Sequence, residues 1–224
     1  SAVQHENLVF FPRATLRISE AAPLRLPGPG VDCNSPAHWD GEQFHVFTSW
    51  FEPYDSIFRN SGSDLSDLRM QRNSEIVGSH RSADGGRWLE ATYKDPDGTL
   101  YGWYHSEPTG LCGAKPLTAP RIGALLSLND GVSWLDLGVV LEAPRGWLDC
   151  EARNGYFAGG HGDFSVILDR EQNFFYFLFS NYSGTAEEQG MAVARMPYGA
   201  RNAPAGNVVK WFRGNWQEPG LGGR

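Results

Sequence analysis

Clusters of basic residues, long apolar runs and closely spaced cysteines are all missing from this sequence of 224 residues. Its 19 Lys and Arg residues are scattered and its formal net charge is −7, whereas binding to a nucleic-acid backbone requires a clustered cationic surface. No apolar run reaches the length of about 18 residues that a membrane-spanning helix needs. The first residues lack the charged and apolar regions of a signal peptide, which could already have been removed. The sequence therefore predicts neither a nucleic-acid partner nor a membrane span.

Cysteine is also scarce. There are only three cysteines, Cys33, Cys112 and Cys150, so at least one of them lies outside any disulfide within the chain. None belongs to a CxxC pair, and the spacing therefore does not predict a zinc site. Cysteine usage leaves the cellular compartment open.

Turn-forming and aromatic residues are abundant by contrast. The chain has 27 Gly, 14 Pro and eight Trp, and aromatic residues make up 13% of it. Because hydrophobic residues reach 41% and charged residues only 20%, a packed core is expected rather than disorder. This composition predicts an all-β domain of short strands joined by tight turns, and it suits surfaces that stack on sugars.

Three segments with alternating polar and apolar residues resemble one another. They span Asp32–Trp50, Glu90–Glu107 and Asp163–Asn181. Each runs from a carboxylate to a closing serine over 17, 16 and 17 residues, through a short strand, a polar turn and an aromatic-rich strand. The turns contain Asp40, Asp97 and Asp169. We expect each segment to be a β-hairpin whose turn is formed by the aspartate.

Each hairpin is followed by a second pair of predicted strands, which makes a repeating unit of four strands. The leading carboxylates are 58 and 73 residues apart, and an inserted segment at 146–161 accounts for the longer interval. A self-similar four-stranded period is typical of a β-propeller. We predict one propeller domain over residues 1–224. Its parts are N-terminal strands in 1–30, blades at 31–88, 89–145 and 162–216, and a tail at 217–224.

Three blades do not close a ring, because the smallest propellers have four. Blade edges left open would also expose unpaired strands, which is an aggregation hazard. We therefore expect that the chain is a fragment, or that a further chain or segment supplies the missing blades.

The segment Ser127–Trp134 resembles the Asp-box turn of sialidase-type propellers, with Asn129 in place of its aspartate. In such a turn a short polar side chain accepts backbone N–H groups and the tryptophan packs between strands. Ser82–Trp88 is a shorter relative of the same pattern.

The blade pattern resembles the five-bladed propeller glycosidases of glycoside hydrolase families 43 and 32, over about residues 31–216. In those enzymes an inner strand begins with an acid, and the next strand is rich in aromatic residues and closes on serine. The stretch GVDCNSPAHWDGEQFHVFTS has this shape, although Cys-Asn-Ser stands where a proline usually follows the acid. The resemblance implies a ring of five blades, hydrolysis of a carbohydrate, and a secreted or periplasmic location rather than a cytoplasmic one.

The heads of the inner strands meet at one mouth of a propeller, so Asp32, Glu90 and Asp163 should converge on a central funnel. Glycoside hydrolysis requires one protonated carboxyl group to release the leaving oxygen and one ionised group to activate water or attack the sugar. The resemblance implies Asp32 as general base, Glu90 as the acid that raises the pKa of the proton donor, and Asp163 as that donor. The family usually has Asp in the second blade and Glu in the third, which is the reverse of Glu90 and Asp163 here. Each acid could instead accept backbone N–H groups at a strand start.

Further residues fall near the predicted funnel. The additional acids are Glu107, Asp149 and Glu151. The candidates for sugar contact are Trp39, His105, Tyr156, His161 and Arg121, and two more aromatic residues nearby are Trp103 and Tyr104. Arg121 could clamp a carboxylated sugar or form an ion pair between blades.

Three functions fit these residues. The leading one is a glycoside hydrolase, which requires no redox cofactor. The same funnel could bind a glycan or a protein without turnover, as a lectin or scaffold does, or His161 and Tyr156 could serve a polysaccharide lyase on the same fold. A structural Ca²⁺ ion on the axis would suit the converging acids, although no local motif demands it, and no other metal site is predicted.

Overall fold

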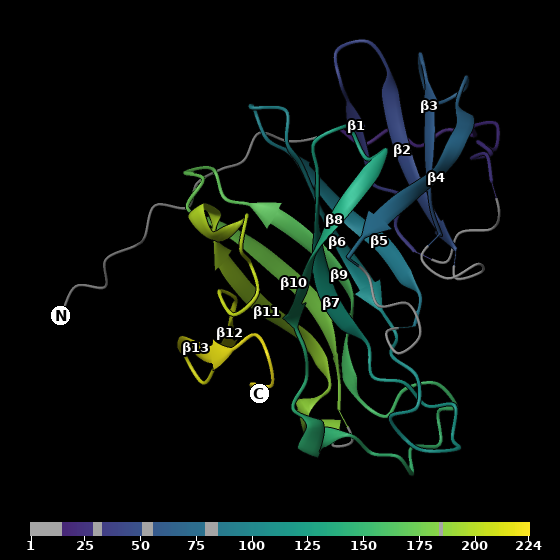
Figure 1. The fold of residues 1–224 in the computed structure, drawn as a ribbon. Coiled ribbons are helices and arrows are strands. Elements are labelled where there is room, and N and C mark those ends of the chain that lie inside the picture. Colours follow the sequence, from purple (N-terminus) through teal and green to yellow (C-terminus); the bar gives the residue numbers. More distant parts are fainter. Residues whose placement is uncertain (1–14, 29–32, 51–55, 79–84, 184–185) are drawn as a thin grey trace.

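The computed structural model describes residues 15–28, 33–50, 56–78, 85–183 and 186–224 (Figure 1). This part of the chain is all-β, as predicted, with strands grouped in three successive units. The first unit contains β1 (Ala37–Trp39), β2 (Phe44–Trp50), β3 (Ser56–Gly62) and β4 (Arg69–Val77). The second contains β5 (Arg87–Lys94), β6 (Leu100–Ser106), β7 (Arg121–Ser127) and β8 (Ser133–Leu141). The third contains β9 (Gly160–Leu168), β10 (Phe174–Tyr182), β11 (Gly190–Pro197), β12 (Val209–Phe212) and β13 (Asn215–Pro219).

Short 3-10 turns account for the helical residues of the described part. They span Arg145–Trp147, Ala186–Glu188 and Tyr198–Ala200. None of them is long enough to cross a membrane.

The three predicted hairpins are present as β1–β2, β5–β6 and β9–β10. Their aspartates form the turns, which confirms that prediction. The Asp40 carboxylate accepts the N–H groups of Glu42 and Gln43. Asp97 accepts the N–H of Thr99, and Asp169 likewise accepts the N–H of a residue four positions later.

Within each unit, consecutive strands pair in antiparallel fashion in chain order. The first two units are joined through their last strands, because β4 and β8 pair in parallel from Glu75–Ser133 to Val77–Leu135. The result is an eight-stranded sheet beside a five-stranded sheet made by the third unit. In Figure 1 the strands of the three units follow one another as twisted β-sheets.

The second unit is covered on both faces. One face packs on the first unit through a cluster that includes Phe47, Leu89 and Trp134. The other face packs on the third unit through a larger cluster that includes Trp103 and Phe177. Burial of these apolar side chains stabilises the packing of the three units, at about 25 cal/mol per Å² of apolar area removed from water.

The turn between β7 and β8 depends on Asn129. Its side-chain oxygen accepts the N–H of Ser133 at 2.9 Å, while the Ser127 hydroxyl accepts the N–H of Gly131 at 2.9 Å. Trp134, which follows the turn, is 1% exposed and packs against Phe47 of the first unit. A short polar side chain thus caps a turn that places an aromatic residue between two units.

The loop after β6 and the loop after β8 lie together at one end of the molecule. A disulfide joins Cys112 of the first loop to Cys150 of the second. Thr118 and Phe157 form a parallel bridge between the same loops. This pair of loops forms one wall of the cavity described next.

Candidate active site

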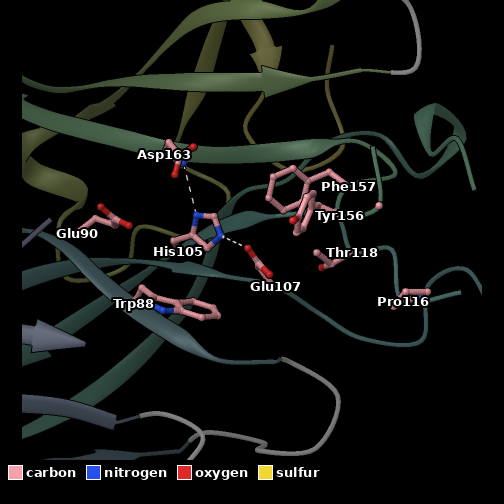
Figure 2. Close-up of a pocket in the computed structure, with 10 residues that line it drawn as sticks. Trp88, Glu90, His105, Glu107, Pro116, Thr118, Tyr156, Phe157 and Asp163 are labelled. Atoms are coloured by element: carbon pink, nitrogen blue, oxygen red, sulfur yellow. Dashed lines mark hydrogen bonds and ion pairs between the residues drawn. The ribbon is translucent and has the colours of Figure 1, made fainter. Parts of the chain in front are cut away.

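A cavity of about 600 Å³ opens between the first strands of the second and third units (Figure 2). It is lined by Trp88, Glu90, His105, Glu107, Pro116, Thr118, Gly155, Tyr156, Phe157 and Asp163. The lining therefore combines three carboxylates, one imidazole and three aromatic rings, without a lysine or arginine among these residues. Such a surface suits a neutral, hydroxyl-rich ligand that stacks on rings and meets acid/base groups.

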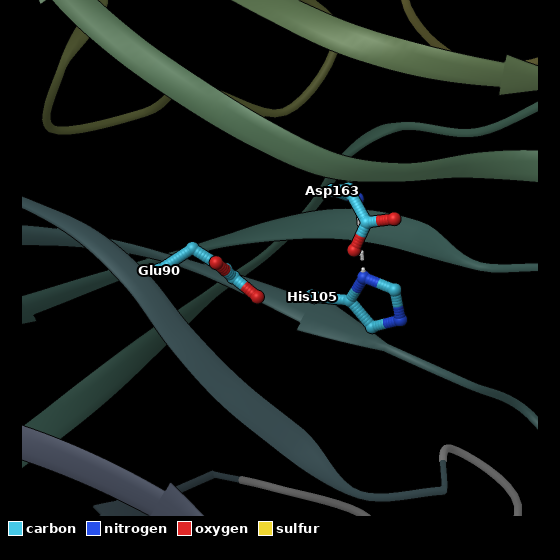
Figure 3. A group of neighbouring side chains, drawn as sticks. All are labelled: Glu90, His105 and Asp163. Atoms are coloured by element: carbon cyan, nitrogen blue, oxygen red, sulfur yellow. Dashed lines mark hydrogen bonds between the residues drawn. The ribbon is translucent and has the colours of Figure 1, made fainter. Parts of the chain in front are cut away.

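Glu90 and Asp163 meet in this cavity although 73 residues separate them. One carboxylate oxygen of Glu90, one carboxylate oxygen of Asp163 and one ring nitrogen of His105 all lie within 4.8 Å of one another (Figure 3). Glu90 comes from β5, His105 from β6 and Asp163 from β9. Two acids and an imidazole from three different strands therefore share one small region of the cavity.

Both acids occupy β-bulges. In β5, Leu89 pairs with Tyr104 and Ala91 with Trp103, so Glu90 is the extra residue. In β9, the pairing with β10 passes from Gly162 to Phe164 and leaves Asp163 as the extra residue. Bulges re-aim side chains and are common beside active sites.

The backbone at Asp163 is strained as well. Its φ of 43° is left-handed, which costs a residue with a side chain about 1–2 kcal/mol. Strain of this kind is frequent at functional sites, where the surrounding contacts hold it in place.

The two acids have different surroundings. Glu90 is 7% exposed and accepts the N–H of Asn34 at 3.2 Å. Asp163 is exposed and accepts the Tyr182 hydroxyl. Burial, together with the hydrogen bond to the negative Asp163, raises the pKa of Tyr182 to about 12, so the phenol remains a donor at neutral pH.

His105 lies between the acids and is 6% exposed. Its Nδ1 accepts the backbone N–H of Asp163 at 3.5 Å, and its Nε2 lies 3.1 Å from the Glu107 carboxylate. Both ring nitrogens are therefore engaged within the protein. Trp88 packs edge-to-face on the ring, with centroids 5.6 Å apart.

The outer wall of the cavity is aromatic. Tyr156 is 71% exposed at the mouth, where its ring is available to a ligand. Phe157 stacks on Tyr182, with ring centroids 4.8 Å apart. The phenol that contacts Asp163 is thereby held against the disulfide-linked loops.

Several predicted residues lie elsewhere, and His161 is the clearest case. It is 1% exposed, lines a separate cavity and accepts a hydrogen bond from the Lys210 ammonium at 2.9 Å. Burial and the positive charge of Lys210 lower the pKa of His161 to about 3. Since His161 and Tyr156 do not share a cavity, the pair proposed for a lyase is not assembled.

Arg121 and Trp39 also lie away from the acids. Arg121 donates to the Ser106 hydroxyl at 3.3 Å and lies 3.8 Å from a Glu142 oxygen, beside another cavity. Trp39 lies in the edge strand β1, where it is 52% exposed beside an apolar groove. Trp103 and Tyr104, expected near the funnel loops, are each 2% exposed core residues.

The other acids predicted from the sequence do not all lie in this cavity. Glu107 lines the cavity. Asp149 accepts the N–H of Glu151 in a loop turn and lines a different cavity. The Glu151 side chain is 86% exposed and pairs with Lys115 at 2.6 Å. Asp32, the expected general base, lies outside the described residues.

Sequence reasoning missed three residues of this site. Trp88 precedes Glu90 by two positions in one strand, so strand alternation would have placed the two on the same face. The turn pattern Ser82–Trp88 instead assigns this tryptophan to a turn. Tyr182 and Phe157 carry no comparable signal, because the contact between them depends on the path of the loop before β9.

A second group, Asp40, His45 and Ser61, has the order of a serine-hydrolase triad. His45 lies 2.7 Å from the Asp40 carboxylate and 2.6 Å from the Ser61 hydroxyl. However, Ser61 is 3% and His45 1% exposed, so no substrate reaches the hydroxyl. Arg59 also contacts the ring at 3.3 Å, so the imidazole is surrounded by protein groups. This group is a structural network.

No family model and no curated protein sequence matches the chain. Solved structures do resemble it. An exo-β-1,3-galactanase from Phanerochaete chrysosporium, solved with galactose, has a TM-score of 0.51 and 15% identity over 80% of this chain and 38% of its own. An endo-arabinase from Bacteroides thetaiotaomicron has a TM-score of 0.51 and 14% identity, over 79% of this chain and 59% of its own.

A β-1,3-galactosidase of glycoside hydrolase family 43, with galactodeoxynojirimycin, has a TM-score of 0.50 and 12% identity over 85% of this chain and 63% of its own. The chain thus spans between about two fifths and just under two thirds of the length of these neighbours. The expected resemblance to family 43 is confirmed at the level of the fold.

Proposed function

We propose that the chain carries the active site of a glycoside hydrolase, with a carbohydrate as its substrate. The carrying observation is that Glu90 and Asp163, from two different units, come together beside His105 within 4.8 Å in a cavity with aromatic walls. If all acids had lain well beyond about 10 Å from one another, a binding protein would have been the better proposal. The fold shared with a galactanase and an arabinase gives independent support.

In this proposal one acid protonates the leaving oxygen and another carboxylate activates water on the opposite side of the sugar ring. The resemblance assigns the donor role to Asp163 and the modulating role to Glu90. Asp32 remains the proposed general base. Among the described residues, Asn34 donates its backbone N–H to Glu90 and its side-chain N–H to the Phe164 carbonyl.

Asp163, Glu90 and Asp32 have the proposed roles of donor, modulator and base, and the Asp163 carboxylate accepts the Tyr182 hydroxyl. Leaving-group dependence separates these roles. A variant that lacks the acid keeps activity on an aryl glycoside with a good leaving group such as dinitrophenolate, but loses activity on an alkyl glycoside.

The experiment is a screen of wild type, Glu90→Gln and Asp163→Asn against aryl β-galactosides, aryl α-arabinofuranosides and the corresponding polysaccharides. The wild type should release sugar, and both variants should lose at least about 100-fold in kcat on the polysaccharides, where the leaving group is poor. Asp149→Asn is the matched control, because that acid lines a different cavity. Equal activity in all four proteins would contradict the proposal.

The second candidate function is glycan binding without turnover, which the exposed Tyr156 ring favours. Calorimetry separates the two functions. A lectin binds oligosaccharide with no product formed, and Tyr156→Ala then weakens binding while Glu90→Gln does not.

A structural Ca²⁺ ion also remains a proposal. It would take oxygens of Glu90 and Asp163, but Ca²⁺ prefers six to eight oxygen ligands and both His105 nitrogens already have partners. The described residues therefore fit this ion poorly, and no step of the proposed reaction uses it.

We further propose that an additional β unit, from another segment or chain, covers the outer face of the third unit in a ring of five blades. Ile167 and Leu178 of that face are 56% and 39% exposed, whereas both faces of the second unit are buried. Light scattering tests this, since Leu178→Glu should remove any association that the wild type shows. A secreted or periplasmic location is part of the proposal and is supported by the Cys112–Cys150 disulfide.

A further inference from the structure

The bulge at Asp163 leaves the backbone N–H of this residue without a hydrogen-bond partner in strand β10. Strand β9 pairs with β10 through Gly162–Ser180 and then Phe164–Phe179, so the Asp163 N–H lies outside the strand ladder. The left-handed φ of 43° at this residue is not a conformation that the chain adopts without support. A neighbouring group must therefore hold the bulge.

The group that meets this N–H is the His105 ring, whose Nδ1 accepts it at 3.5 Å (Figure 3). The ring fits here because position 162 is glycine. A Cβ at Gly162 would lie 2.8 Å from Cε1 of His105 and 2.9 Å from Pro120. The sequence of β9 thus provides the space for His105 directly beside the residue that needs an acceptor.

Glu107 sets the tautomer of the ring. A carboxylate can only accept, so the contact of 3.1 Å requires that Nε2 carries the proton. In the neutral ring Nδ1 then has a free lone pair, and this nitrogen faces the Asp163 N–H. The order of groups is therefore Asp163 N–H to Nδ1, and Nε2–H to Glu107.

We infer that His105 is a positioning residue: its unprotonated Nδ1 holds the Asp163 bulge and so fixes the Asp163 carboxylate beside Glu90. The effect on rate rests on the proposed hydrolase function. The hydrogen bond itself does not, because it can be measured without a substrate. His105 thus acts through Asp163, and not through the direct sugar contact expected from the sequence.

Two variants separate the two sides of the ring. In His105→Asn, the amide oxygen occupies the place of Nδ1 and can accept the Asp163 N–H, while the contact with Glu107 is lost. In His105→Gln, the longer side chain places its amide near Nε2 and keeps the Glu107 contact, while Nδ1 has no substitute. Thermal unfolding of both variants confirms that each is folded.

The first readout is amide hydrogen exchange at Asp163, measured by NMR on the whole chain. Exchange should be faster in the Gln variant and close to wild type in the Asn variant, and the wild-type ring should show the Nε2–H tautomer in ¹H–¹⁵N spectra. Unchanged exchange in the Gln variant, or an Nδ1–H tautomer in the wild type, would overturn the inference.

The second readout is the kinetics on whichever glycoside the wild type cleaves. The Gln variant should lose about 10- to 100-fold in kcat, the range expected for a carboxyl group displaced by about 1 Å, with little change in KM. The Asn variant should keep most of kcat. Equal losses in the two variants would overturn the inference. If the wild type cleaves no glycoside, the proposed function fails, and the exchange and tautomer measurements alone decide the contact.

Discussion

Acidification should destabilise this protein through His161. Its ring is 1% exposed, and Nδ1 lies 3.1 Å from the Gly160 carbonyl oxygen, to which it donates. Lys210, itself 2% exposed, donates to Nε2 and to the carbonyl oxygens of Glu142 and Gly223. A proton on Nε2 would displace one of the three partners of a buried ammonium and place two positive charges side by side.

The sign and the size of the effect follow from linkage. Burial and the Lys210 charge lower the pKa of His161 to about 3, against 6.5 for an exposed ring. Between these values the unfolded chain binds a proton that the folded chain does not, so stability falls as the pH falls. At about 1.4 kcal/mol per pH unit, the His161 contribution between pH 7 and pH 4 is a loss of about 3 kcal/mol.

The assay is urea unfolding at pH 7 and pH 4, followed by tryptophan fluorescence. Carboxylates titrate in the same range, so the wild type is compared with His161→Gln, which can accept from Lys210 but does not titrate. The free energy of unfolding of the variant should fall by about 3 kcal/mol less than that of the wild type. Lys210→Met should recover only part of this difference, because burial is the larger cause. Equal losses in the wild type and His161→Gln would refute the reasoning.

Three further predictions concern stability. Burial lowers the pKa of Lys210 to about 8 from 10.5. Between these pH values the unfolded chain binds a proton that the folded chain does not, so the free energy of unfolding should increase as the pH rises. Urea unfolding of the wild type and Lys210→Met at several pH values checks this, and parallel pH dependences of the two proteins would contradict it. Replacing Cys112 and Cys150 with Ser opens a loop with a separation of 38 residues and should cost about 4 kcal/mol, measured by urea unfolding against the wild type under oxidising conditions. Asn129→Ala removes the cap of the β7–β8 turn and should cost about 1 kcal/mol, whereas Asn129→Asp should cost less; a thermal shift of the same size for both would count against the capping role.

Much of the fold was predictable because the same local signals occur three times. Each hairpin has an aspartate that forms its turn and an aromatic-rich second strand, and these signals act over a few residues. The meeting of Glu90 and Asp163 follows from the same repetition, since equivalent strand heads converge when units stack. The parallel pairing of β4 with β8 had no such signal, because it depends on how two units twist against each other.

His161 lies two positions before Asp163 and is predicted from the sequence to be near the funnel. In the structure both residues belong to β9, and residues two apart in a regular strand share a face. The bulge at Asp163 interrupts this alternation and leaves His161 against Phe179 in the core. The partner of His161, Lys210, comes from β12 and lies 49 residues further along the chain, where no local pattern points to it. Arg121 likewise faces a separate cavity although it begins the strand beside His105.

We propose that the cavity between the second and third units cleaves glycosidic bonds with Glu90 and Asp163. The most direct test is sugar release by the wild type, Glu90→Gln and Asp163→Asn from aryl and alkyl glycosides, with oligosaccharide binding measured in parallel. We expect hydrolysis by the wild type and a loss of at least about 100-fold in kcat in each variant on the alkyl substrate, with binding retained. Binding by all three proteins with no sugar released by any of them would contradict the claim.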